Sequence, residues 1–151
     1  MKVGDLLPRF EAQDQHDQLL RSEDLLDGNF LVIYFYPKNF TPGCTREACG
    51  FRDQFDDLAE AGARVVGVSK DSVSSHGRFA KRYHLPFILL SDAKGKIAKK
   101  FGVKNTMMGL LPGRETFIFD PDGKLIFRLR SMAADPHIRK AVKLIKSHAR
   151  V

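Results

Sequence analysis

The sequence predicts an α/β fold in which a mixed central sheet is flanked by helices. Three observations lead to this prediction. The run Phe30–Tyr36 is apolar or aromatic at all seven positions, which is typical of a central strand buried on both faces. Strand and helix patterns then alternate along the chain, as they do in units with parallel strands. A strong turn signal at Asp120-Pro121-Asp122-Gly123 adds an antiparallel hairpin, so the sheet is expected to be mixed.

The N-terminal elements come before and include the central strand. Residues 10–20 alternate weakly between apolar and polar side chains and predict a short N-terminal β-hairpin at the edge of the sheet. Ser22 is expected to cap a single helical turn over residues 22–26. Pro37 ends the apolar run and therefore ends the central strand.

A long amphipathic helix is predicted from Pro42 to Ala61, with Gly62 ending it. Apolar residues recur there at spacings of four, three, four and three, which form one stripe on a helix. The stripe consists of Cys44, Ala48, Phe51, Phe55 and Leu58. Residues 64–69 predict a second strand, residues 72–83 a second helix, and residues 87–90 and 94–101 a short strand and a short helix.

The last third of the chain predicts the hairpin and a final helix. Residues 115–119 and 125–129 flank the turn and form the two strands. Asp135-Pro136 opens the last helix, with Asp135 as its N-cap. The expected buried stripe of this helix is Ile138, Ala141, Val142, Ile145 and Ala149. Its lysines at 140, 143 and 146 are expected to face solvent and not to form a binding patch.

The length of 151 residues predicts a single domain over residues 1–151. Its hydrophobic content of 43% is sufficient for an apolar core. The first residues lack an apolar signal-peptide core, and no stretch approaches the ~18 apolar residues of a membrane span. A cytoplasmic protein is therefore expected. The net charge of +7 is scattered without a run of five like charges, so neither a nucleic acid nor a membrane is expected as a partner.

The only two cysteines, Cys44 and Cys49, follow the central strand and lie five residues apart. Sites in such sheets form beyond the carboxyl ends of the strands, which is where the segment Pro37–Cys44 falls. Only a thiolate attacks, so Cys44 needs electropositive surroundings. The first helical turn supplies free N–H groups and the positive end of the helix dipole, while Gly43 allows close approach and Thr41 can bring a hydroxyl. The pair indicates thiol redox chemistry with no cofactor and no metal.

These residues match a known family. The motif Pro-x-x-x-Thr-x-x-Cys at positions 37–44 resembles the active-site signature of the peroxiredoxins. The longer string Tyr34–Thr45 is similar to the peroxiredoxin Q branch, also called bacterioferritin comigratory protein. Cys49 falls where many members carry a resolving cysteine, and Arg114 matches the family's active-site arginine. The resemblance covers essentially the whole chain and implies a thioredoxin-like fold.

The resemblance implies a thioredoxin-dependent, atypical 2-Cys peroxiredoxin that reduces hydrogen peroxide and organic hydroperoxides. Cys44 would be the peroxidatic thiolate that becomes a sulfenic acid, with the N–H group of Gly43 and its own N–H nearby. Cys49 would condense with it to an intramolecular disulfide. A thioredoxin or glutaredoxin-like reductant would reopen that bond, and the protein would be a monomer.

Supporting roles also follow from the resemblance. Thr41 and Arg114 would orient the peroxide and stabilise the charge on the leaving oxygen. Pro37 would shield the sulfenate from water. Glu47 matches a family glutamate that holds the arginine.

The spacing of the two cysteines has a geometric consequence. In an intact helix, positions i and i+5 have Cα atoms ~8.6 Å apart, with ~140° between their directions. A disulfide tolerates at most ~7 Å. We therefore expect the first turns of this helix to unwind before Cys44 and Cys49 can bond, while Phe55 and Leu58 anchor its later turns.

Several alternatives stay open. The two cysteines could be plain core residues. His76 and His84 lack cysteine partners and are expected at the surface or on a helix face, not on a metal. The segment Met107–Leu111 could line a pocket for bulky hydroperoxides or could simply pack. A disulfide oxidoreductase of the same fold is disfavoured because Cys-x-x-Cys is absent. A non-enzymatic basic binder or holdase is disfavoured because nothing localises the charge.

Overall fold

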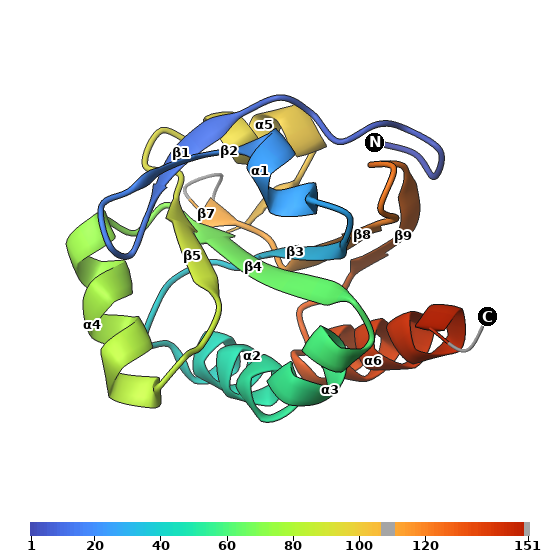
Figure 1. Cartoon of the computed structure of the whole chain (residues 1–151). Coiled ribbons are helices and arrows are strands. Elements are labelled where there is room, and N and C mark those ends of the chain that lie inside the picture. The colour runs from blue at the N-terminus through green and yellow to red at the C-terminus, as the bar shows by residue number, and fades with distance from the viewer. Residues whose placement is uncertain (107–110, 150–151) are drawn as a thin grey trace.

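The computed structural model describes residues 1–106 and 111–149 and contains a seven-stranded sheet (Figure 1). The strand order is β2-β1-β5-β4-β3-β8-β9. The strands of this sheet are β1 (Glu11–Asp14), β2 (Leu19–Arg21), β3 (Phe30–Phe35), β4 (Ala63–Ser69), β5 (Ile88–Ser91), β8 (Glu115–Phe119) and β9 (Leu125–Arg130). Two short strands, β6 (Asn105–Thr106) and β7 (Leu111–Pro112), pair separately.

The sheet is mixed, as predicted. Strands β3, β4 and β5 run parallel, whereas β8 pairs with β3 and with β9 in the antiparallel sense. The hairpin β1–β2 lies at one edge and joins the sheet through an antiparallel pairing of β1 with β5. The prediction of an edge hairpin, a central strand and a closing hairpin is confirmed.

Helices cover both faces of the sheet (Figure 1). They are α1 (Ser22–Leu26), α2 (Pro42–Asp53), α3 (Phe55–Glu60), α4 (Val73–Tyr83), α5 (Lys96–Phe101) and α6 (Asp135–Ala149). Figure 1 shows α1 and α5 above the sheet and α2, α3 and α6 below it. Because side chains alternate along a strand, β3 contributes to a buried apolar core on each face.

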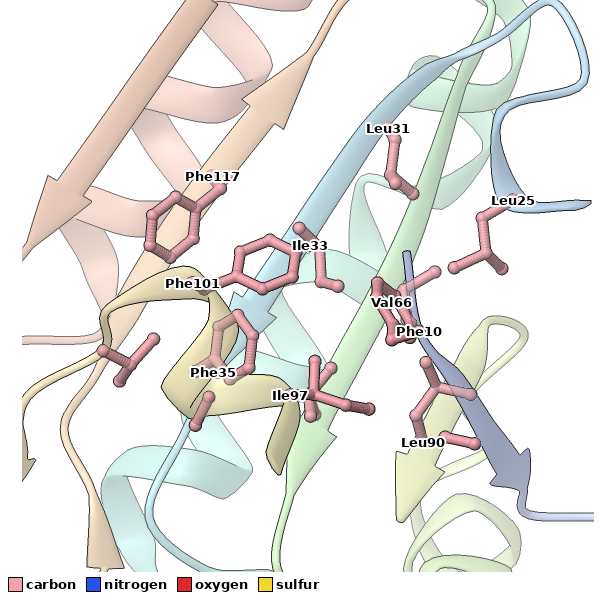
Figure 2. Close-up of a cluster of buried hydrophobic side chains, with 14 of the residues drawn as sticks. Phe10, Leu25, Leu31, Ile33, Phe35, Val66, Leu90, Ile97, Phe101 and Phe117 are labelled. Carbon is pink, nitrogen blue, oxygen red and sulfur yellow. The ribbon is translucent and has the colours of Figure 1, made fainter. Parts of the chain in front are cut away.

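One core lies under α1 and α5. It receives Ile33 and Phe35 from β3, and Figure 2 shows Phe101 of α5 close to Phe35 and Phe117. The other core receives Tyr34 of β3 and contains Cys44. The structure therefore places Cys44 against the sheet, on the face covered by α2 and α6.

Three predicted helix boundaries are wrong. The helix expected over residues 42–61 is interrupted at Gln54, so α2 and α3 are separate helices and Phe55 and Leu58 belong to α3. Ser22 is not a cap, since Arg21 is at the N-cap position and the Ser22 hydroxyl accepts a hydrogen bond from the N–H of Phe10. The last helix begins at Asp135 itself, which places this residue inside the helix.

The two histidines were expected at the surface or on a helix face: His76 lies on the buried face of α4, and His84, at the end of α4, is exposed. The Nε2 atom of His76 lies 3.0 Å from the carbonyl oxygen of Leu90, and its Nδ1 lies 3.0 Å from the amide nitrogen of Asn39. Burial lowers the pKa of His76. Asp71 in turn accepts a hydrogen bond from the backbone N–H of Asn39 at 2.9 Å. This buried polar group ties the loop before Cys44 to α4.

Candidate active site

Cys44 lies in the first turn of α2 and is buried, with 1% of its surface exposed. The helix begins after Thr41, whose backbone is extended, and Pro42 stands at its first position. The first intrahelical bond runs from the N–H of Thr45 to the carbonyl of Thr41. The N–H groups of Gly43 and Cys44 precede it and, together with the helix dipole, make this end of α2 electropositive.

Arg114 directs its guanidinium at the Cys44 sulfur. Its Nη2 atom lies 3.6 Å from Sγ, its Nη1 donates to Glu47 Oε1 at 2.6 Å, and its Nε donates to the carbonyl of Met132 at 3.0 Å. All three nitrogens of the fork are thus engaged, and only 4% of the residue is exposed. Burial opposes the charge of Arg114, but Glu47 and Cys44 together raise its pKa. The guanidinium stays charged and is held in one orientation.

The absence of a side chain at Gly43 leaves space for this guanidinium. A Cβ atom at position 43 would lie 2.8 Å from Nη2 of Arg114, closer than such atoms approach in proteins. The sequence predicted that glycine allows close approach at this position. The group that approaches in the structure is the arginine.

The loop before α2 contains Pro37 and Thr41. Pro37 is half-buried and follows β3 after one residue, Tyr36. Thr41 is at the N-cap position, but its side chain does not cap the helix; its hydroxyl donates to the carbonyl of Lys38 at 2.8 Å. Thr41 therefore adjoins the cysteine-bearing turn, and Pro37 precedes it in the same loop.

Cys49 is half-buried, and neither cysteine is in a disulfide. Both belong to the uninterrupted helix α2, Pro42–Asp53. The turns between them also contain Glu47 and Ala48, which are fully buried. The two cysteines are thus free thiols on one intact helix. Their spacing in the sequence predicts that no disulfide can form between them in this arrangement.

Two buried residues near Glu47 were missed in the sequence analysis. His137 of α6 and Thr116 of β8 are 0% exposed, and the Thr116 hydroxyl lies 2.7 Å from His137 Nδ1. Glu47 Oε2 lies 3.9 Å from the same Nδ1. His137 precedes Ala141 and Ile145 by four and eight residues, so the helical period already placed a histidine on the buried stripe.

The site contains no feature that calls for a metal. Within residues 1–106 and 111–149, no three His, Cys, Asp or Glu side chains are grouped so that they could bind an ion.

Over the same residues, every helix is too short or too polar to cross a membrane. Of the segment Met107–Leu111, residues 107–110 lie outside the described part of the chain, and Leu111 begins β7.

The chain is similar to known proteins over most of its length. The model of the AhpC/TSA family matches residues 3–128. The chain is 43% identical over 146 residues to the chloroplastic peroxiredoxin Q of Sedum lineare, which covers 95% of this chain and 77% of the relative. The chain belongs to the AhpC/TSA family, in its peroxiredoxin Q branch.

Solved structures of peroxiredoxins share the fold. Peroxidoxin BcpB of Mycobacterium tuberculosis is 40% identical, with a TM-score of 0.91 and 97% of each chain covered. The bacterioferritin comigratory protein of Xanthomonas campestris is 32% identical, with a TM-score of 0.85, 93% of this chain and 92% of that chain covered. The predicted family and thioredoxin-like fold are confirmed. This peroxiredoxin is a thiol-dependent peroxidase that acts on peroxide substrates and is reduced by a thioredoxin-like partner.

Proposed function

We propose that Cys44 is the thiolate that attacks the peroxide. The sulfur forms a bond to one peroxide oxygen while the O–O bond breaks, which yields a Cys44 sulfenic acid and an alkoxide or hydroxide. That leaving oxygen takes up one proton and departs as an alcohol or water. The observation that carries the proposal is the position of Sγ, in the first turn of α2 and 3.6 Å from Nη2 of Arg114.

Charge on the reacting oxygens is stabilised by fixed donors. Arg114 cannot swing away, because Glu47 and the carbonyl of Met132 hold two of its nitrogens. The N–H groups of Gly43 and Cys44 point out of the helix start, where no carbonyl of the helix can accept from them. Preorganised donors of this kind need no reorganisation as the O–O bond breaks. Thr41 and Pro37 border the same turn, and we assign them to orienting the peroxide and shielding the sulfenate.

We assign Cys49 to the resolving step. Its thiol displaces the hydroxyl of the sulfenic acid, so that one disulfide and one water form. Positions 44 and 49 of an intact helix are ~8.6 Å apart at Cα, beyond the ~7 Å limit, so the first turns of α2 have to unwind. Phe51, which stacks on Tyr34 with ring centroids 4.9 Å apart, would keep the rest of α2 in place.

Unwinding also displaces Glu47, since it lies between the two cysteines in the chain. Its hydrogen bond to Arg114 would break in the disulfide form and return on reduction. The anchor after Cys49 is thus Phe51 within α2, and not Phe55 and Leu58 as the sequence suggested, because these two belong to α3.

The substrates that we propose are hydrogen peroxide and organic hydroperoxides. The related Xanthomonas protein is described for its alkyl peroxide reduction activity, which supports the second class. A thioredoxin or glutaredoxin-like protein would be the reductant.

We also propose that the protein is a monomer, since resolution within one chain requires no second subunit. We propose a cytoplasmic location as well; the Sedum relative is chloroplastic, so the compartment differs among relatives.

Rapid mixing of the reduced protein with one equivalent of hydrogen peroxide tests the assignment of Cys44. We expect fast oxidation at Cys44, located by peptide mass, which Cys44→Ser abolishes and Cys49→Ser preserves. Arg114→Ala should slow the attack, whereas Arg78→Ala, which removes the same charge from the exposed face of α4, should not. Oxidation of Cys44 no faster than that of a free cysteine would refute the proposal.

A further inference from the structure

A buried polar cluster contacts Arg114 at Nη1, the neighbour of the nitrogen that faces the sulfur. It consists of Glu47 of α2, Thr116 of β8 and His137 of α6, all 0% exposed. Oε1 of Glu47 accepts from Arg114, but Oε2 has no hydrogen-bond partner. A buried carboxylate oxygen without a donor is costly, so the ionisation of Glu47 needs a physical explanation.

Hydrogen-bond directions around His137 define which of its nitrogens carries hydrogen. Nε2 lies 2.7 Å from the carbonyl oxygen of Ser131, and a carbonyl can only accept, so Nε2 donates. In the neutral ring Nδ1 is then an acceptor, and the Thr116 hydroxyl donates to it at 2.7 Å. The single lone pair of Nδ1 is thus occupied by Thr116, and Glu47 Oε2, 3.9 Å away, receives no donor from the ring. An ionised Oε2 would lie beside an acceptor with no hydrogen-bond donor, so this position favours the protonated, neutral carboxyl.

The charges of the site lead to the same conclusion. Arg114 is one buried cation, and two groups that can be anions, the Cys44 thiolate and the Glu47 carboxylate, contact the same guanidinium. A buried cluster with a net negative charge is unfavourable, so one proton stays on one of the two acids. If it stays on Cys44, the nucleophile is lost. If it stays on Glu47, Arg114 is paired with the sulfur.

We propose that Glu47 is protonated in the reduced enzyme, with the hydrogen on Oε2. His137 is in this way a positioning residue: as a neutral ring that presents Nδ1 as an acceptor, it offers Oε2 no donor, keeps Glu47 neutral and so leaves the charge of Arg114 to Cys44. The inference rests on the proposed role of Cys44 as the attacking thiolate. It adds that Glu47 holds Arg114 as a neutral acceptor and not as a carboxylate.

The ionisation tendencies of both groups support this arrangement. Burial raises the pKa of Glu47 to about 8, although the charge of Arg114 and its hydrogen bond act in the opposite direction. Burial lowers the pKa of His137, to which the charge of Arg114 also contributes. At neutral pH the carboxyl therefore keeps a proton and the imidazole does not take one. The other titratable groups that interact with this pair are Tyr34 of β3, Tyr36 directly after β3, Glu115 of β8 and Lys140 of α6.

Infrared difference spectroscopy of the reduced protein tests the protonation of Glu47 directly. At about pH 7 we expect the carbonyl-stretch band of a protonated carboxyl group in the native protein and its loss in Glu47→Gln. Thr116→Val frees the lone pair of His137 Nδ1 for the hydrogen on Oε2, so it should shift the frequency of this band. A spectrum without a band that Glu47→Gln removes would overturn the proposal. A band that Thr116→Val does not shift would refute the role of His137.

The pH dependence of peroxide attack tests His137 in the reaction. In His137→Phe, Oε2 no longer lies beside the Nδ1 lone pair and the Thr116 hydroxyl loses its acceptor and becomes available to an ionised Oε2, so Glu47 becomes more acidic and competes with Cys44 for Arg114. The midpoint of the rate against pH should then rise by about one unit, a roughly tenfold loss of rate below the midpoint. His148→Phe is the matched control, since His148 lies on the same helix and is exposed. A profile of His137→Phe that superimposes on the native one would refute the inference, and if that variant does not fold, the Thr116→Val spectrum decides.

The two proposals fail in different ways. If Cys44 is not the attacking thiolate, peroxide oxidation at this residue is slow in every variant, while the infrared band of Glu47 is still present. If Glu47 is ionised, the band is missing, while Cys44 still reacts quickly with peroxide.

Discussion

Replacement of Gly43 by alanine should separate stability from activity. The new methyl group would stand 2.8 Å from Nη2 of Arg114, and the guanidinium would have to retreat by about 0.6 Å to reach ordinary contact distance. It cannot do so freely, because Nη1 is bound to Glu47 at 2.6 Å and Nε to Met132 at 3.0 Å. The expected displacement is away from Cys44, at the cost of the contact with its sulfur.

The size of the effect follows from the contacts that are lost. A hydrogen bond to a charged group contributes about 1.5–3 kcal/mol. Since each 1.36 kcal/mol corresponds to a factor of ten in rate, loss of one such contact in the transition state should slow peroxide attack by about 10- to 150-fold. Alanine in place of glycine in a helix contributes up to about 1 kcal/mol of stability. Because displacement of the guanidinium offsets this gain, Gly43→Ala is expected to have a free energy of unfolding close to or below that of the native protein, and to react more slowly.

Single-turnover oxidation by hydrogen peroxide, combined with urea unfolding, measures both quantities. The matched control is Gly77→Ala in α4, where a Cβ would have only the carbonyl of Gln15 nearby, at 3.5 Å. That variant should gain up to about 1 kcal/mol of stability without slower attack, since its new methyl group meets no clash. If Gly43→Ala attacks peroxide at the native rate, the guanidinium at Nη2 does not contribute to the reaction and our account of the site is wrong.

Three further predictions address the second cysteine, the buried acid and the helix packing. Cys49→Ser should keep the first oxidation but lose turnover with thioredoxin, and normal turnover in a coupled assay would exclude Cys49 as the resolver. The pKa of Glu47 is raised from 4.5 to about 8, so between these two pH values the folded protein keeps a proton on Glu47 that the unfolded chain has lost. The free energy of unfolding therefore falls as the pH rises from 4.5 to about 8. Glu47→Gln should remove this slope of about 1.4 kcal/mol per pH unit, measured by urea unfolding, and equal slopes would show that Glu47 is ionised. A methyl group on Gly50 would overlap the Ile138 side chain, so Gly50→Ala should cost about 1–3 kcal/mol and Ile138→Ala should reduce that cost in a double-mutant cycle; additive effects would contradict the contact.

Local patterns were sufficient for the elements that carry the cysteines. A run of seven apolar residues is compatible only with burial, and Phe30–Phe35 forms the central strand β3. A regular apolar spacing defines a helix face, and Cys44 lies on the buried face of α2. The break at Gln54 was not predictable from that spacing, because the apolar stripe continues through it and the change of direction depends on what α3 packs against.

The surroundings of the thiol depend on contacts between distant segments. Glu47 and Arg114 are 67 residues apart, and Thr116 and His137 are 21 apart, so no local periodicity relates them. The sequence alone determined the fold class, the family, and the two cysteines five residues apart on one helix. Through the family resemblance, the sequence also pointed to Arg114 and Glu47. Only the tertiary structure decided which guanidinium nitrogen faces Cys44, which oxygen of Glu47 has no donor and which histidine lies beside it. Hydrophobic periodicity reports whether a side chain is buried, whereas its hydrogen-bond partners depend on how α2, β8 and α6 pack together.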